Sequence, residues 1–420
     1  MDVWVAAAIF LVTYGLIATE RVHKTVAALA GGVAMIVLGV LDQEEAFAAI
    51  DFNVIFLLLG MMVIANVMRR TGVFQWVAIR AIRFAGGEPW RMLIALCAIT
   101  AIASAFLDNV TTVVLIGPIT LFIAAALGVS PVPYLIAEIL ASNIGGTATL
   151  IGDPPNILIG SAAGFDFATF AANMAPVSVL VFVAFIVLAR FMFGAELAAQ
   201  RQHLRAIDLD ESGVITDRRL MRISVAVLLL TIAGFLVAGP LGHEPATIAL
   251  LGASVLFLLT REQPEEALSE VEWTTLLFFV GLFVVVEGLV HVGIIRAVAD
   301  GLFRLTGGEA TTTSLALMWL SAIASGIVDN IPYTATVIPV VQGLGERGVE
   351  LEPLWWSLAL GADFGGNATI IGASANVIIA DLARRSGHAI SFRQFLRYGV
   401  PTVVLSLAIA TVYVYLRYLA

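Results

Sequence analysis

The amino-acid sequence predicts an all-helical, polytopic membrane protein, and three observations support this fold class. Of the 420 residues, 60% are hydrophobic and only 13% are Asp, Glu, Lys or Arg, whereas ordinary soluble proteins carry about 25% charged residues. The mean hydropathy is +0.99. Apolar runs of about 20 residues, the length that crosses a hydrocarbon core, recur along the chain. This composition excludes a soluble enzyme, a nucleic-acid-binding protein and a disordered scaffold.

The first apolar run, residues 3–19, is expected to stay as the first span. Only Asp2 precedes it, so the cationic region and the cleavage site of a signal peptide are both missing. Further spans are expected at about 24–41, 52–68, 133–160, 168–193, 222–239, 246–260, 272–290, 353–380 and 398–417.

Two longer apolar regions, about 89–127 and 310–345, carry a polar break near the middle. The breaks lie at Asp108-Asn109 and Asp329-Asn330. Each region is therefore two crossings or a re-entrant hairpin, and either choice returns the chain to the same side.

The distribution of Lys and Arg predicts the orientation, because basic loops stay in the cytoplasm. With the N-terminus outside, 18 of the 22 Lys and Arg fall in cytoplasmic loops. We therefore expect an inner (plasma) membrane protein with both termini outside and a charged cytoplasmic linker at 195–221.

The two halves of the chain match at an offset of about 220 residues. SAFLDN at 104–109 aligns with SGIVDN at 325–330 at an offset of 221, and NIGGTATLIG at 143–152 aligns with DFGGNATIIG at 363–372 at an offset of 220. This register predicts an internal duplication.

Each half contributes an odd number of crossings, five, plus one hairpin, so the halves enter the membrane from opposite sides. The sequence thus predicts two inverted repeats, at 1–194 and 222–420. This architecture is typical of secondary transporters, which bind their substrate near the midplane where the repeats meet.

One span in each repeat is interrupted by glycines and polar residues, at Gly145-Gly146 and at Gly365-Gly366. Backbone N–H and C=O groups that lose their helical hydrogen bonds at such a break must line a cavity or be buried in protein. The hairpin tips add helix N-termini, with unpaired N–H groups and partial positive charge. Two tips and two broken helices would form a site of carboxamides, hydroxyls and dipoles, in which aspartates carry protons or pair with a cation.

The run LDNVTT at 107–112, followed by SNIGGTATLIGDPPNILI at 142–159, resembles the arsenite/antimonite efflux permease family (ArsB type) and its relatives, including the P protein, in the ion transporter superfamily. The resemblance covers essentially the whole chain. It implies ten transmembrane helices and two re-entrant hairpins in two inverted repeats, and export of As(OH)3 or Sb(OH)3 against an inward proton flow. An elevator-type movement is implied by more distant relatives.

We therefore expect a proton-coupled arsenite or antimonite exporter that is not an enzyme and has neither cofactor nor bound metal. The proton-coupling candidates are Asp108, Asp329 and Asp363, and a structural helix break is expected at Asp153, Pro154 and Pro155. The substrate-binding candidates are Asn109, Thr111, Ser142, Asn143, Gly145, Gly146, Thr147, Asn330, Gly365, Gly366 and Asn367.

Local structural roles are the alternative for several of these residues. Asp at a tip can simply cap the next helix, Ser and Thr can bond back to a carbonyl, and glycine pairs can serve close packing. A sodium/proton antiporter or a citrate/dicarboxylate carrier is the alternative function. An aspartyl protease is disfavoured because the GxGD motif is absent.

The expected partners are the lipid bilayer, protons and a small inorganic solute, with no nucleic acid. A soluble ATPase partner and a homodimer are both compatible with the sequence. Cys97, the single cysteine, allows neither an intramolecular disulfide nor a thiolate cage for a metal.

Overall fold

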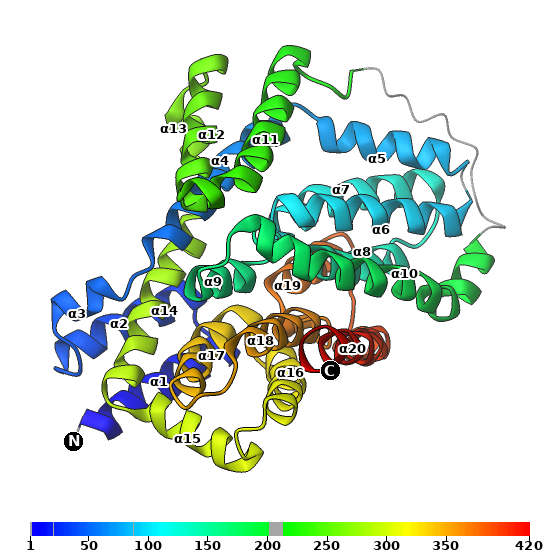
Figure 1. Cartoon of the computed structure of the whole chain (residues 1–420). Coiled ribbons are helices and arrows are strands. Elements are labelled where there is room, and N and C mark those ends of the chain that lie inside the picture. Colours follow the sequence, from blue (N-terminus) through cyan, green and yellow to red (C-terminus); the bar gives the residue numbers. More distant parts are fainter. Residues whose placement is uncertain (1, 20, 87, 201–212) are drawn as a thin grey trace.

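The computed structural model describes residues 2–19, 21–86, 88–200 and 213–420, and every regular element in this part of the chain is a helix (Figure 1). The predicted fold class is therefore confirmed. The helices of the first half are α1 (Asp2–Thr19), α2 (Lys24–Val37), α3 (Gln43–Ala48), α4 (Phe52–Arg70), α5 (Val73–Phe84), α6 (Pro89–Phe106), α7 (Asn109–Leu127), α8 (Val132–Gly146), α9 (Pro154–Ala163) and α10 (Phe167–Gln200).

The second half repeats this order, so that α1 corresponds to α11 and α10 to α20. Its helices are α11 (Arg218–Ala238), α12 (Pro245–Thr260), α13 (Pro264–Ser269), α14 (Trp273–His291), α15 (Ile294–Thr306), α16 (Ala310–Ile327), α17 (Asn330–Gly345), α18 (Leu351–Gly365), α19 (Ser374–Arg385) and α20 (Phe392–Val414), with short turns η2 (Gly239–Leu241), η3 (Ile370–Gly372) and η4 (Tyr415–Leu419).

Nine helices in the described residues are long and apolar enough to cross a membrane, and α2 and α12 are shorter apolar helices. The predicted hairpins are α6–α7 and α16–α17, and each turns at the expected Asp-Asn pair. The predicted spans at 133–160 and 353–380 are each two half-helices, α8 with α9 and α18 with α19.

Six helices, α1, α2, α4, α11, α12 and α14, pack together into a group that we call the frame. Glycine allows the closest approaches within it. A Cβ atom on Gly60 of α4 would lie 2.6 Å from the backbone of Ala249 in α12, and one on Gly281 of α14 would be equally crowded by Ala28 in α2. The contact between α4 and α12 therefore has the same form as the repeat-related contact between α14 and α2.

The hairpins and broken helices, α6–α9 and α16–α19, form a second group that we call the hairpin domain. Its two halves also match. A Cβ on Gly145 would lie 2.5 Å from the Cα of Ala101, and one on Gly365 would lie 2.5 Å from the Cα of Ala322. Close packing of half-helix on hairpin is thus one reason for glycine at these breaks.

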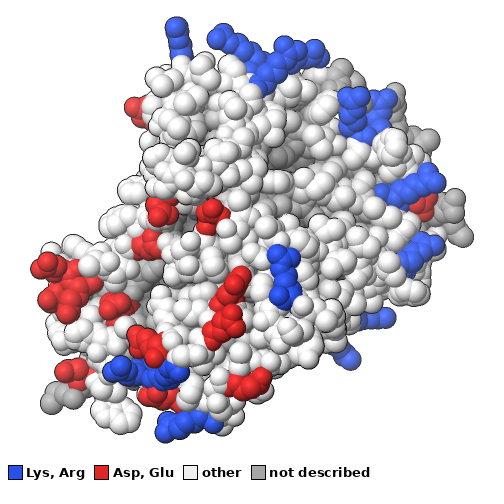
Figure 2. Space-filling view, in the orientation of Figure 1, with Lys and Arg blue, Asp and Glu red and all other residues white. Residues whose placement is uncertain are grey.

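Charges of opposite sign gather at different ends of the helices. Figure 2 shows Lys and Arg over the upper ends of α11 and α12, and Asp and Glu around α3 at the left. This sorting supports the predicted orientation, although which end faces the cytoplasm stays a prediction. Helix α10 runs to Gln200, inside the range predicted as the linker, and residues 201–212 of that linker lie outside the described residues.

Candidate substrate and ion site

The two hairpin tips converge on one buried carboxylate. Asn109 begins α7 at tip 1 and Asn330 begins α17 at tip 2, and their Nδ2 groups donate hydrogen bonds to the two oxygens of Asp153, at 2.8 Å and 3.2 Å. The sequence predicted that the tips meet, but it assigned Asp153 only a structural role.

The helix break at Asp153 has the predicted position and a different side-chain role. Asp153 stands at the N-cap of α9, with Pro154 and Pro155 in the first turn, yet its side chain caps no backbone group. Its oxygens instead join the tips of both repeats.

Asn143, near the end of α8, connects the repeats a second time. Its Oδ1 accepts a hydrogen bond from Asn109 at 3.3 Å, and its Nδ2 donates to Asn367 Oδ1 at 2.9 Å and to Asn376 Oδ1 at 3.0 Å. All of these side chains are buried. The sequence-predicted asparagines are thus brought together, mainly as partners of one another.

Two further asparagines belong to this network and were not among the predicted site residues. Asn156 donates to the carbonyl oxygens of Gly146 at 3.2 Å and Thr149 at 3.0 Å. Asn376 makes the corresponding bonds to Gly366 and Thr369, both at 2.8 Å. Their match in the repeat, at an offset of 220, was the signal that could have found them.

Asp363 stands in the second repeat where Asn143 stands in the first. Its carboxyl group is fully buried beside Asn156 and Thr147, and neither of its oxygens receives a hydrogen bond. The amide hydrogens of Asn156 and the hydroxyl of Thr147 are directed at backbone carbonyls instead. This carboxyl group therefore lacks the donors that Asp153 has.

The aspartates at the tips cap the helices that follow them. Asp108 caps α7, accepting from Thr111 N at 2.8 Å and from Thr111 Oγ1 at 2.6 Å, and has a positive φ of 61°. Asp329 caps α17 through Ile331 N at 3.0 Å and also pairs with Lys24 at 3.1 Å. The capping alternative is therefore realised at both tips, and their proton-coupling role stays a prediction.

The remaining predicted residues lie around this centre. Thr147 Oγ1 bonds back to the carbonyl of Asn143 at 2.8 Å, as the local alternative expects. Ser142 Oγ contacts Ser104 Oγ at 3.2 Å and the carbonyl of Asn109 at 3.4 Å.

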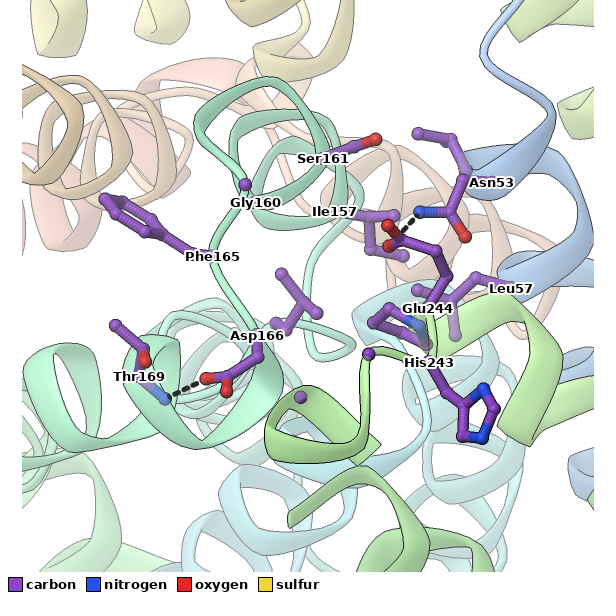
Figure 3. Close-up of a pocket in the computed structure, with 16 residues that line it drawn as sticks. Asn53, Leu57, Ile157, Gly160, Ser161, Phe165, Asp166, Thr169, His243 and Glu244 are labelled. Carbon is purple, nitrogen blue, oxygen red and sulfur yellow. Dashed lines mark hydrogen bonds between the residues drawn. The ribbon is translucent and has the colours of Figure 1, made fainter. Parts of the chain in front are cut away.

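Two cavities of about 340 Å³ each adjoin both the frame and the hairpin domain. Figure 3 shows the first, where Glu244 at the start of α12 points toward Asn53, whose Nδ2 donates to it at 2.8 Å, and where Ser161 and Asp166 lie on and just beyond α9.

The second cavity is lined by Lys24, Asp329 and Ser374. Lys24 is the only lysine in the sequence. It corresponds in the repeat to Glu244 of the first cavity, so the two cavities are related positions with opposite charge.

A family profile described as a citrate transporter (CitMHS) matches residues 14–361 of this chain. The chain belongs to the CitMHS family. An "uncharacterized transporter" of Mycobacterium tuberculosis is similar to it, with 46% identity over 99% of this chain and 98% of the relative. This CitMHS protein is therefore a membrane transporter of the ion transporter superfamily.

The human P protein is 35% identical over 98% of the chain, which spans 59% of the P protein's length. A solved structure of the YdaH transporter of Alcanivorax borkumensis matches with a TM-score of 0.62 at 16% identity, covering 98% of this chain and 96% of that one, and shows the fold alone. The predicted kinship with the P protein is confirmed, whereas none of these relatives is named an arsenite permease.

Proposed function

We propose that this CitMHS-family transporter is proton-coupled and that Asp363 carries the proton. The supporting observation is the symmetry of the central network. Asn143 donates to Asn367 and Asn376 of the other repeat. Asp363, its counterpart, faces Thr147 and Asn156, which correspond to those two residues.

The side-chain acceptors of Asp363 and Asn156 lack a hydrogen-bond donor. Asn156 Oδ1 is buried without a donor, like both oxygens of Asp363, and its Nδ2 is oriented by two backbone carbonyls. These three buried acceptors, on neighbouring residues, are desolvated without a compensating hydrogen bond. A proton on Asp363 supplies the donor that Asn143 supplies in the other repeat, so binding and release of this proton rearranges the contact between repeats.

The chemistry of the site favours a substrate that donates hydrogen bonds. Asn109 Oδ1 is a further buried acceptor without a donor. A small neutral hydroxylated solute offers such donors, and we propose arsenite and antimonite as the first solutes to test. Their export against an inward proton flow would follow the expectation from the sequence.

Citrate is the second candidate because the family profile carries that description. The two buried carboxyl groups at the centre, Asp153 and Asp363, would repel a polyanion. A carboxylate substrate would therefore need protonation of these groups or a bound cation such as sodium, which also keeps a sodium/proton antiporter in consideration.

Uptake into proteoliposomes tests these assignments. Arsenite, citrate, phosphate and sodium are offered side by side, each with a pH gradient, a sodium gradient or neither. We expect pH-driven flux of one solute in the wild type and its loss in Asp363→Asn. Asp381→Asn is the matched control, because Asp381 lies on α19 and pairs with Arg384 and Arg385 away from the central network. Undiminished pH-driven flux in Asp363→Asn would contradict the assignment of the coupled proton to this residue.

A further inference from the structure

Lys24 ties the frame to the hairpin domain. Its Nζ lies 3.1 Å from Asp329 Oδ2 and donates to Ser374 Oγ at 2.6 Å, and Ser374 Oγ donates to the same carboxylate oxygen at 2.8 Å. The ammonium also sits 5.1 Å from the ring centre of Phe278. Lys24 begins α2 of the frame, whereas Asp329 and Ser374 precede or begin α17 and α19 of the hairpin domain.

A second contact joins the same two groups nearby. Tyr14 of α1 donates to the carbonyl of Pro332 at 2.8 Å and lies 2.5 Å from Thr336 Oγ1, both on α17. Tip 2 and its helix are thus held against α1 and α2 by an ion pair and two hydrogen-bond contacts.

The repeat-related positions of this triad carry different residues. In the order Lys24, Asp329, Ser374, the counterparts are Glu244, Asp108 and Pro154. Asp108 is bonded to Thr111 at the start of α7, and Glu244 is bonded to Asn53 of the frame. An ion pair between the repeats is therefore replaced, at the related positions, by two acids that each bond to another partner.

A further asymmetry lies at the boundary between the two groups of helices. The close glycine contacts inside the frame match between repeats, as do those inside the hairpin domain. Across the boundary, Ser161 of α9 donates to Asp51 at the start of α4, whereas Asp381, the counterpart of Ser161, pairs with arginines of its own helix.

The same difference appears along α1 and α11. Thr336 meets Tyr14, but Leu115, the counterpart of Thr336, belongs to an apolar cluster with Leu228 of α11. The counterpart of Tyr14 is Gly234, six residues further along α11, a separation of about 9 Å at the α-helical rise.

In a transporter built from inverted repeats, an asymmetric boundary between two such groups is expected of one member of a pair of conformations. In the other member each repeat takes the boundary contacts that its partner has now. Asp108 would then approach Glu244, and Asp329 would leave Lys24.

We propose that Lys24, Asp329 and Ser374 form a one-sided latch that stabilises the present conformation. The opposite conformation has no such latch, because Glu244 occupies the place of the lysine and faces Asp108 with like charge. Glu272 and His23 also face the Lys24 side, while Asp51, Asp166 and His243 lie near Glu244. The proposal rests on the transporter alternating between two conformations and is independent of the substrate and of Asp363.

Cross-linking of a cysteine pair that meets only in the opposite conformation tests the latch. Leu115→Cys and Gly234→Cys are introduced with Cys97→Ser, and the cross-linking rate is measured in proteoliposomes without substrate. Lys24→Met releases the latch, and Glu244→Lys builds its mirror image opposite Asp108. Glu244→Gln is the control that removes repulsion without supplying a cation.

We expect Lys24→Met and Glu244→Lys each to raise the cross-linking rate about fivefold or more, the scale of a modest coupling energy, with a smaller rise for Glu244→Gln. Size-exclusion profiles check that each variant is folded. An unchanged rate in folded Lys24→Met would show that the ion pair does not hold the conformation. A rate in Glu244→Lys no higher than in Glu244→Gln would overturn the mirror relation. Either result leaves the proton-coupling proposal standing, because no transport is measured.

Discussion

Two buried aspartates of the same network differ in what surrounds their oxygens. Asp153 receives one amide hydrogen from each hairpin tip, whereas Asp363 receives none and neighbours Asn156, whose Oδ1 is also without a donor. A carboxylate that accepts hydrogen bonds is stabilised in its ionised form. A carboxyl group among acceptors can form a hydrogen bond only when it is protonated. The two groups are therefore suited to different tasks, the first to joining the tips and the second to binding a proton.

The same substitution is expected to act with opposite sign at these two positions. Asp363→Asn supplies Nδ2 donors toward Asn156 and should stabilise the protein by about 1 kcal/mol. Asp153→Asn turns an amide N–H group toward the N–H donors of Asn109 or Asn330. Because two donors then face each other, this variant should destabilise the protein by about 1–3 kcal/mol. Thermal unfolding of both variants in the same lipid–detergent mixture measures the difference. Equal shifts would show that the asparagine environment does not distinguish the two carboxyl groups.

At the scale of helices, the sequence predicted positions better than contacts. The apolar runs and the Asp-Asn pairs located the hairpins and their tips, because chain length and polar breaks are local properties. The pairing of Lys24 with Asp329 spans 305 residues and depends on how the frame sits against the hairpin domain. The N-cap interpretation of Asp153 was local as well, and could not show that tip residues from both repeats would bind its oxygens.

Close helix packing in the frame predicts a strong difference between two glycines. Gly60 has no room for a methyl group, because its Cβ would lie 2.6 Å from Ala249, while Gly15 of α1 has no neighbour within 4 Å. Gly60→Ala should destabilise the protein by about 1–3 kcal/mol through overpacking, and Gly15→Ala should leave it unchanged or slightly more stable. Thermal unfolding with a fluorescent thiol probe on Cys97 compares them. Equal stability of the two variants would contradict the packing assigned to α4 and α12.

At the scale of the whole molecule, the duplication explains both what is shared and what is not. Matching glycine contacts recur within the frame and within the hairpin domain, so the duplication accounts for the close helix packing inside each group. The residues that differ between repeats, Asn143 against Asp363 and Lys24 against Glu244, lie at the contacts between repeats or between the two groups. The residues to which we assign the proton and the latch therefore lie where the duplicated sequence has diverged.

The inverted arrangement also predicts which ends of the helices face the cytoplasm. In the predicted topology, eighteen of the 22 Lys and Arg fall on the side of the linker, and such loops are retained inside the cell. In a Cys97→Ser background, a cysteine replacing the exposed Gln43 of α3 should react with an impermeant maleimide in intact cells. A cysteine replacing the exposed Thr216 beside the linker should react only after the membrane is opened. The reverse labelling pattern would show the opposite membrane orientation, with the Lys24 cavity on the outer face and the Glu244 cavity on the cytoplasmic face.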